Sequence, residues 1–174
     1  MDIIILLIQS LWFIIPAYAA NGFPPLMRGK HPIDQKRSFR SKRILGDGKT
    51  WEGTLGGIIA GMAIGSLQIA FQSDLKFLGL NLPPMTLPLV IALCIGTMAG
   101  DILGSFIKRR LNIKRGDSAP LMDQEGFLVL AILFAMPFYN LNAIIVVTLL
   151  IITPPIHWLA NIGGFYLKFK KTPW

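Results

Sequence analysis

The segment that decides the fold is GDILGSFIKRRLNIKRGDSAPLMDQE, residues 100–125, which places four carboxylates and five cations between long apolar segments. A charged side chain in or near hydrocarbon costs at least a few kcal/mol unless it is paired, so such residues usually serve a function. Carboxylates bind divalent cations, and Lys and Arg bind phosphates. The segment therefore predicts a metal-dependent phosphate site at a membrane surface.

Composition indicates the class of protein. The chain has 174 residues, of which 53% are hydrophobic and 15% charged, and its mean hydropathy is +0.57. Charged residues make up roughly a quarter of an ordinary soluble domain. We therefore predict a single membrane domain over residues 1–174. Cys94 is the only cysteine in the sequence, so neither a disulfide framework nor a cysteine-based metal site is expected.

Hydropathy predicts an all-α integral membrane protein with about five transmembrane helices, at residues 3–20, 54–72, 86–107, 126–138 and 143–162. The fourth segment is short, and we expect it either to tilt little or to begin inside the preceding polar loop. Residues 17–20 resemble a signal-peptidase site, but the acidic start at Asp2 favours a first span that is retained.

The basic residues predict the topology. Sixteen of the 17 Lys and Arg residues lie in the loops 21–52 and 108–125 or in the C-terminal tail, and Lys76 alone lies on the other side. Cationic loops stay in the cytoplasm. We predict a multi-pass protein of the cell membrane with its N-terminus outside and its C-terminus in the cytoplasm. Topology accounts for the net charge of +8, so no nucleic-acid partner is expected.

The second predicted span carries glycines at positions 57, 61 and 65, which fall on one face of a helix. Small residues at this spacing let a neighbouring helix approach closely. We expect this face to serve packing, because it carries no group that can do chemistry.

Asp101, Ser105 and Lys108 share one face of the third predicted span. Because a helix rises about 1.5 Å per residue, Asp101 lies roughly 10 Å deeper than Lys108, just below the membrane surface. Asp117 and Asp123 follow in a loop short enough to fold back over the same helix end. These oxygen ligands suit Mg²⁺, as one ion or two. A simple capping pair between Asp101 and a basic residue is the alternative.

The segment GDGKTWEG, residues 46–53, is the second candidate element. A glycine-rich turn that opens a helix exposes N–H groups and the positive end of the helix dipole, which can hold a phosphate. The segment is not a Walker A motif, since Arg43 stands where the first glycine is required. A flexible turn without a ligand is the alternative. His31 and His157 are isolated in the sequence, so zinc is not expected.

Two patterns resemble a known family. The first is Ser105, Lys108-Arg109, Lys114, Asp117, Pro120 and Asp123-Gln124; the second is the run KTWEG at 49–53 with glycines at 56 and 57. Together they resemble the signature of the phosphatidate cytidylyltransferases (CDP-diacylglycerol synthases), over roughly residues 17–130. The chain is shorter, Arg115-Gly116 is inserted before Asp117, the His-Gly-Gly turn is missing, and Gln124 replaces an arginine. These departures resemble the archaeal branch, the CDP-archaeol synthases.

The resemblance implies transfer of CMP from CTP to an isoprenoid ether-lipid phosphate, 2,3-bis-O-geranylgeranyl-glycerol 1-phosphate, with Mg²⁺ as cofactor and pyrophosphate as the second product. The topology predicted above places the site on the cytoplasmic side, and a homodimer stays possible. The resemblance assigns metal binding to Asp101, Asp117 and Asp123, catalysis to Asp101, Asp123 and Lys108, and nucleotide binding to Asn21, Lys49, Thr50, Glu52, Ser105, Arg109 and Lys114.

Two other classes of function stay open. In a small ion-coupled transporter, Asp101 would be an ion-binding residue, although the sequence contains no internal repeat of the kind that many transporters show. In a membrane scaffold, the basic loops would bind anionic lipid, which leaves the acidic residues unexplained.

Overall fold

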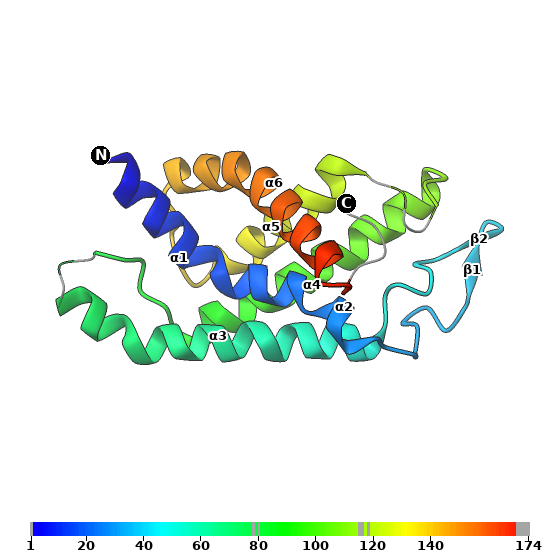
Figure 1. Cartoon of the computed structure of the whole chain (residues 1–174), viewed down its shortest axis with the longest axis horizontal. Coiled ribbons are helices and arrows are strands. Elements are labelled where there is room, and N and C mark those ends of the chain that lie inside the picture. The colour runs from blue at the N-terminus through cyan, green and yellow to red at the C-terminus, as the bar shows by residue number, and fades with distance from the viewer. Residues whose placement is uncertain (1, 78, 80, 115–116, 118, 170–174) are drawn as a thin grey trace.

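Helices make up most of the chain (Figure 1). The structure is a computed structural model that describes residues 2–77, 79, 81–114, 117 and 119–169. Its elements are α1 (Ile3–Gly22), α2 (Pro24–Met27), β1 (Ser38–Phe39), β2 (Lys42–Arg43), α3 (Trp51–Phe77), α4 (Leu87–Arg110), α5 (Pro120–Ala135) and α6 (Ala143–Tyr166).

Four segments of the described chain form helices long and apolar enough to cross a membrane: Ile3–Met27, Trp51–Phe77, Leu87–Arg110 and Ala143–Tyr166. The expected helical membrane protein is confirmed. The fifth helix, α5, has 16 residues, fewer than the roughly 20 that a bilayer crossing needs.

The helix α5 begins earlier in the chain than the hydropathy pattern suggested, at Pro120 instead of near residue 126. Proline fits the first turn of a helix because the N–H it lacks would have no partner there. The carboxylate of Asp123 accepts a hydrogen bond from the backbone N–H of Ala119, at 3.2 Å, which satisfies a donor at the helix start. The first turn of α5 is therefore stable as a helix although it is polar and precedes the apolar segment that begins near residue 126.

Successive long helices run in opposite directions along the long axis (Figure 1). The N-terminus and the end of α6 consequently lie toward opposite ends. The chain between α2 and α3 meets the end of α4 at one end of the bundle, where Lys42 Nζ donates to the carbonyl of Arg110 at 3.2 Å. At the other end Trp12 Nε1 donates to the carbonyl of Pro83 at 3.0 Å.

The glycine face of α3 packs closely against its neighbours, as expected. A Cβ atom on Gly61 would lie 2.5 Å from Cys94 Sγ of α4 and 2.6 Å from the carbonyl oxygen of Pro16 in α1. On Gly65 it would lie 2.2 Å from a methyl carbon of Val90. Larger side chains would push α3 away from both helices.

A second pair of glycines joins α4 to α5. A Cβ atom on Gly96 would lie 2.5 Å from the carbonyl oxygen of Leu130, and one on Gly100 would lie 2.5 Å from that of Gly126. The two backbones therefore touch over at least one helical turn. This contact lies beside the acidic segment, since Gly100 directly precedes Asp101.

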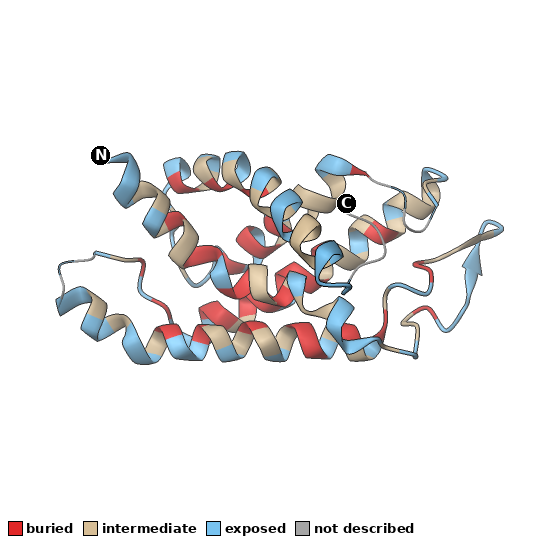
Figure 2. Cartoon of the chain, viewed as in Figure 1, coloured by how far each residue is buried: buried red, intermediate tan, exposed pale blue. Residues whose placement is uncertain are grey.

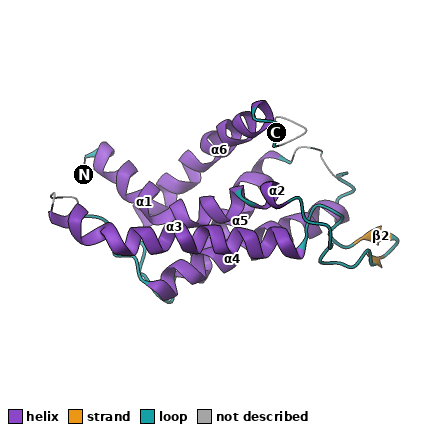
Figure 3. Cartoon of the chain, turned by 60° about the horizontal axis from the view of Figure 1, so that its bottom comes forward, coloured by secondary structure: helices purple, strands orange, loops and turns teal. Residues whose placement is uncertain are grey.

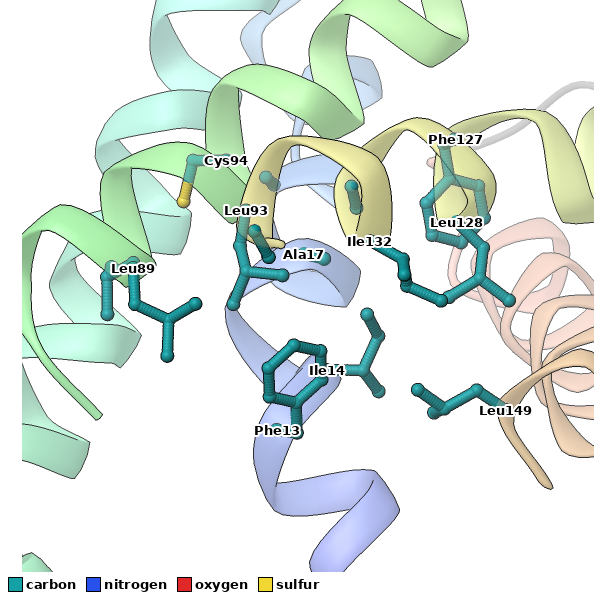
Figure 4. Close-up of a cluster of buried hydrophobic side chains, with 14 of the residues drawn as sticks. Phe13, Ile14, Ala17, Leu89, Leu93, Cys94, Phe127, Leu128, Ile132 and Leu149 are labelled. Atoms are coloured by element: carbon teal, nitrogen blue, oxygen red, sulfur yellow. The ribbon is translucent and has the colours of Figure 1, made fainter. Parts of the chain in front are cut away.

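The apolar core lies where α1, α4, α5 and α6 meet (Figure 4). Phe13 and Ile14 of α1 face Leu93 of α4, Leu128 of α5 and Leu149 of α6, and all five side chains are buried. Buried positions gather on the inner faces of the helices, while the outer faces are exposed and apolar (Figure 2). Such outer faces are those that lipid covers.

The last helix stands apart from the others over its second half (Figure 3). Among the described elements α6 packs against α1 and α5, and not against α3 or α4. The hairpin β1–β2 extends beyond the end of the helices on the side of the polar loops (Figure 3).

Candidate active site

A cavity of about 780 Å³ lies at the end of the bundle that carries the polar loops. This size falls within the range of about 300–1,000 Å³ that small-molecule sites occupy. Charged residues of its lining are Arg28, Asp47, Lys49, Asp101, Lys108, Asp117 and Asp123. Aromatic and apolar residues of the same lining include Tyr18, Phe127, Ile156, Ala160, Leu167 and Phe169. A single cavity thus offers both a polar and an apolar surface.

Two lysine–aspartate pairs lie among the charged residues of the cavity lining. Lys49 Nζ lies 2.5 Å from Asp101 Oδ2, and Lys108 Nζ pairs with Asp123 Oδ1. The close contact of Gly100 with Gly126 explains why the two aspartates share one cavity, because it holds α4 and α5 together just beside them. Asp101 is thus paired with a basic residue that comes from the segment before α3.

The turn that carries Lys49 is held by Asp34, a residue that the sequence did not single out. The buried carboxylate of Asp34 accepts five hydrogen bonds. The donors are the backbone N–H groups of Lys36, Leu45 and Gly46 and two nitrogens of the Arg43 guanidinium, at 2.8 to 3.1 Å. The sequence signal was weak, since an acidic residue in a basic loop normally lies in solvent.

The charge of Asp34 is stabilised by this network. The hydrogen bonds from Arg43, and those from Gly46, Leu45 and Lys36, hold the pKa of the Asp34 carboxyl well below its usual range, against the effect of burial. In turn, Asp34 raises the pKa of Arg43, which also pairs with Asp47 at 2.9 Å. Both groups are therefore charged at neutral pH.

Two further sets of contacts tie the loop to the helices. The segment around His31 runs beside the Lys49 turn, with Ile33 N donating to the carbonyl of Lys49 at 2.9 Å. Arg110, at the end of α4, donates to the carbonyls of Phe39, Lys42 and Arg43 and lies over the ring of Phe39. Arg110 therefore fixes the hairpin onto α4, a structural role beyond marking topology.

The predicted phosphate-binding turn does open a helix, because α3 begins at Trp51. Thr50 caps this helix, since its hydroxyl oxygen accepts a hydrogen bond from Gly53 N at 3.1 Å, and Thr50 also lines the cavity. Glu52, by contrast, does not line the cavity. Its carboxylate accepts hydrogen bonds from the backbone of Lys30 and His31 and pairs with His31 Nδ1 at 2.5 Å, outside the cavity.

The other predicted residues divide into two groups. Asn21 and Asp117 line the cavity, as do Lys49, Thr50, Asp101, Lys108 and Asp123. Ser105, Arg109, Lys114 and Glu52 are not among its lining residues. Ser105 is buried, the guanidinium of Arg109 lies 3.9 Å from the position of a Cβ on Gly46, and Lys114 N donates to Asp117 Oδ2 at 3.1 Å.

Among the residues that the structure describes, no three acidic, histidine or cysteine side chains are grouped closely enough to hold a metal ion by themselves. The donor set nevertheless fits Mg²⁺, which usually takes one or two carboxylates and completes its coordination with substrate phosphates and water. Asp101 and Asp123 are the two carboxylates, and each is neutralised by a lysine ammonium group.

Comparison with known proteins gives the family. The family described as "CarS-like: CDP-archaeol synthase" matches residues 3–174. The chain belongs to the CDP-archaeol synthase family. It is 45% identical to a CDP-archaeol synthase of Pyrococcus horikoshii, with 97% of both chains covered. It is 42% identical to one of Methanococcus maripaludis over the full length of both chains.

A solved structure supports the same family. An intramembrane enzyme for archaeal membrane lipids biosynthesis matches with a TM-score of 0.76 and 34% identity, covering 89% of this chain and 94% of that chain. As a member of the CDP-archaeol synthase family, the protein is a membrane nucleotidyltransferase of archaeal lipid synthesis, acting on a nucleotide and a lipid phosphate. The transporter and scaffold hypotheses consequently have no support.

Proposed function

We propose that the protein transfers CMP from CTP to 2,3-bis-O-geranylgeranyl-glycerol 1-phosphate in a reaction that requires Mg²⁺. One observation carries the proposal: both lysine–aspartate pairs line a cavity whose lining also contains apolar side chains. A water-soluble nucleotide and a lipid headgroup can meet only where a polar surface and an apolar surface adjoin. The cavity of this chain provides that boundary.

In this proposal the nucleotide phosphates bind at the start of α3. Lys49 and Thr50 line the cavity there, and the positive end of the α3 dipole faces the same turn. Lys108 lines the same cavity and neutralises charge on the α-phosphate or on the departing pyrophosphate. Asn21 is a candidate contact for the ribose or the base.

The four predicted residues that do not line the cavity take indirect roles. Glu52 holds the segment at His31 against the start of α3. Arg109 lies near the turn at Gly46, and Lys114 fixes Asp117 through its backbone N–H. Ser105 is buried within α4. They would shape the nucleotide site without touching the nucleotide.

Asp101 and Asp123, with Asp117 as a third carboxylate, are the residues proposed to hold Mg²⁺, as one ion or two. When bound, the ion neutralises charge that develops on the phosphates. Lys49 and Lys108, which line the cavity, would contact phosphate oxygens of the bound nucleotide. An oxygen of the lipid phosphate attacks the α-phosphorus of CTP, and the bond to the β-phosphate oxygen breaks.

The proposed orientation places the cavity on the cytoplasmic side. The cationic loops lie at the cavity end of the bundle, and cationic loops stay in the cytoplasm. CTP is then supplied directly from the cytosol. We treat residues 1–174 as a single membrane domain.

The test is turnover by the purified protein with labelled CTP, Mg²⁺ and the ether-lipid phosphate. We expect Asp101→Asn and Asp123→Asn each to reduce the rate of CDP-lipid formation by at least about 100-fold. Asp74→Asn, at an exposed position near the far end of α3, is the matched control and should keep the wild-type rate. Wild-type rates in both cavity variants would refute the proposal.

A further inference from the structure

A second cavity lies beside the start of α3, outside the candidate active site. Its volume is about 580 Å³. None of the described residues that line it also lines the active-site cavity. The proposed cytidylyl transfer therefore gives it no role. The lining residues are His31, Pro32, Gln35, Lys36, Trp51, Glu52 and Leu55.

The helix side of this second cavity continues into a surface of the kind that lipid covers. Trp51 and Leu55 line the cavity and are 51% and 55% exposed, and Ile59, one further turn along α3, is 67% exposed. Residues four positions apart share one face of a helix. The apolar segment of α3 begins near residue 54, so Trp51 lies at the membrane boundary, where tryptophan is enriched. Leu55 and Ile59 then lead from the cavity toward the acyl chains.

The loop side of the second cavity is basic. Residues 28–43 contain seven Lys and Arg residues and one acidic residue, Asp34, which pairs with Arg43. Lys36 lines the cavity and is exposed. No carboxylate among the described residues forms an ion pair with Lys36. Its ammonium group is therefore available to an anion.

Glu52, the acidic residue of this lining, is bonded to the loop. Its carboxylate accepts hydrogen bonds from the backbone N–H groups of Lys30 and His31 and pairs with His31 Nδ1. The backbone N–H of Trp51 donates in turn to the carbonyl of His31 at 3.0 Å. These contacts hold the loop against the start of α3, so the cavity is a built part of the fold.

We propose that the second cavity binds an anionic lipid of the surrounding membrane. The headgroup phosphate lies at Lys36, and an acyl chain follows Leu55 and Ile59. Basic residues near the membrane surface attract anionic headgroups. A free phosphate would use the basic side of the cavity and leave its apolar side in water, so a lipid matches the whole lining. This lipid is distinct from the one that reacts in the active-site cavity.

A lipid at this position would also act on the turn that carries Lys49. Pro32 lines the second cavity and forms an antiparallel bridge with Thr50. The next residue, Ile33, donates its backbone N–H to the carbonyl of Lys49 at 2.9 Å. A ligand stabilises the arrangement that it binds. The order of the Lys49 turn should therefore depend on the lipid composition of the membrane.

The first test measures which lipids contact Trp51. The full chain is reconstituted in phosphatidylcholine vesicles with equal small fractions of spin-labelled phosphatidylglycerol or spin-labelled phosphatidylcholine, each labelled near the headgroup end of an acyl chain. The signal of Trp51 is the part of the tryptophan fluorescence that Trp51→Phe removes. We expect phosphatidylglycerol to quench this signal more strongly, and Lys36→Gln to reduce that preference about fivefold, because Lys36 attracts the anionic headgroup.

Arg40→Gln is the matched control. It removes the same charge from the same loop, but Arg40 is exposed in the hairpin and does not line the second cavity. This variant should keep most of the preference for phosphatidylglycerol. An equal loss in both variants would indicate diffuse attraction to the basic loop, and equal quenching by the two lipids in the wild type would indicate no anionic site. Either result would overturn the inference.

The second test follows the loop by hydrogen exchange. The amide of Ile33 should exchange more slowly in vesicles that contain phosphatidylglycerol than in phosphatidylcholine alone, and Lys36→Gln should remove most of this difference. An exchange rate that does not respond to phosphatidylglycerol in the wild type would refute the effect on the Lys49 turn. Neither measurement requires turnover, so failure of the proposed cytidylyl transfer would leave both results unchanged.

Discussion

Asp34→Asn is the substitution that most directly tests how the Lys49 turn is held. The asparagine keeps the shape of the side chain, but its amide nitrogen adds donors to a site where five N–H groups already converge. The side chain of Asp34 is 0% exposed and that of Arg43 is 29% exposed. The substitution therefore leaves a partly buried guanidinium without its carboxylate.

The expected cost follows from this geometry. Removing one partner of a buried ion pair costs about 3–5 kcal/mol. Arg43 is partly exposed and keeps its contact with Asp47, so we expect a value near the lower limit, about 3 kcal/mol. The substitution lowers the free energy of local opening of the loop by this amount. The population of molecules with an open loop therefore becomes roughly 100-fold larger.

Hydrogen exchange measures this population directly. The amides of Leu45 and Gly46 donate to Asp34 at 3.1 and 3.0 Å, so they should exchange about 100-fold faster in Asp34→Asn. Amides in the middle of α3 should keep wild-type protection, and Asp74→Asn serves as the control substitution. Unchanged exchange at positions 45 and 46 would refute the conclusion that Asp34 holds the turn.

Three other predictions concern stability. The pKa of the Asp34 carboxyl is lower in the folded chain than in the unfolded one, so the folded loop is destabilised when this carboxyl becomes protonated. The loop amides should therefore be protected from hydrogen exchange at pH 5 and lose this protection as the pH falls below about 4. Arg110→Ala should free the hairpin, seen as faster tryptic cleavage in the loop while the melting temperature of the helices is kept. Gly61→Ala should overpack against Cys94 and reduce the free energy of unfolding by about 1–3 kcal/mol, seen as a lower melting temperature in detergent. Gly22→Ala is the control and should keep the wild-type melting temperature, because no atom lies within 4 Å of the added Cβ.

Features with a local or periodic signal could be predicted from the sequence. The long apolar segments, the glycine face of α3 and the polar end of the bundle follow from hydropathy, spacing and charge. Asp101 and Asp123 stood out because carboxylates are rare beside apolar helices, and the structure brings both to one cavity. Their assignment to metal binding remains a proposal.

Features that depend on distant contacts could not be predicted. The Lys49–Asp101 pair joins residues far apart in the sequence, and it depends on the path of the loop that Asp34 organises. Gly96 and Gly100 were hidden within an apolar run. Ser105 and Glu52 fell on a motif but not in the cavity, because a linear motif does not show which face of a helix points toward the cavity.

The shortness of α5 has a consequence for the surrounding bilayer. Its 16 residues extend about 24 Å, against a hydrocarbon thickness of about 30 Å, and Val129, Leu133 and Phe134 on it are exposed. Lipid in contact with such a helix thins locally, at a modest cost for each ångström of mismatch. We therefore expect headgroups beside α5 to lie closer to the depth of Asp123 than they would in an unperturbed bilayer. Turnover should then respond to the chain length of the host lipids, with thicker bilayers slowing the enzyme even where every protein contact is unchanged.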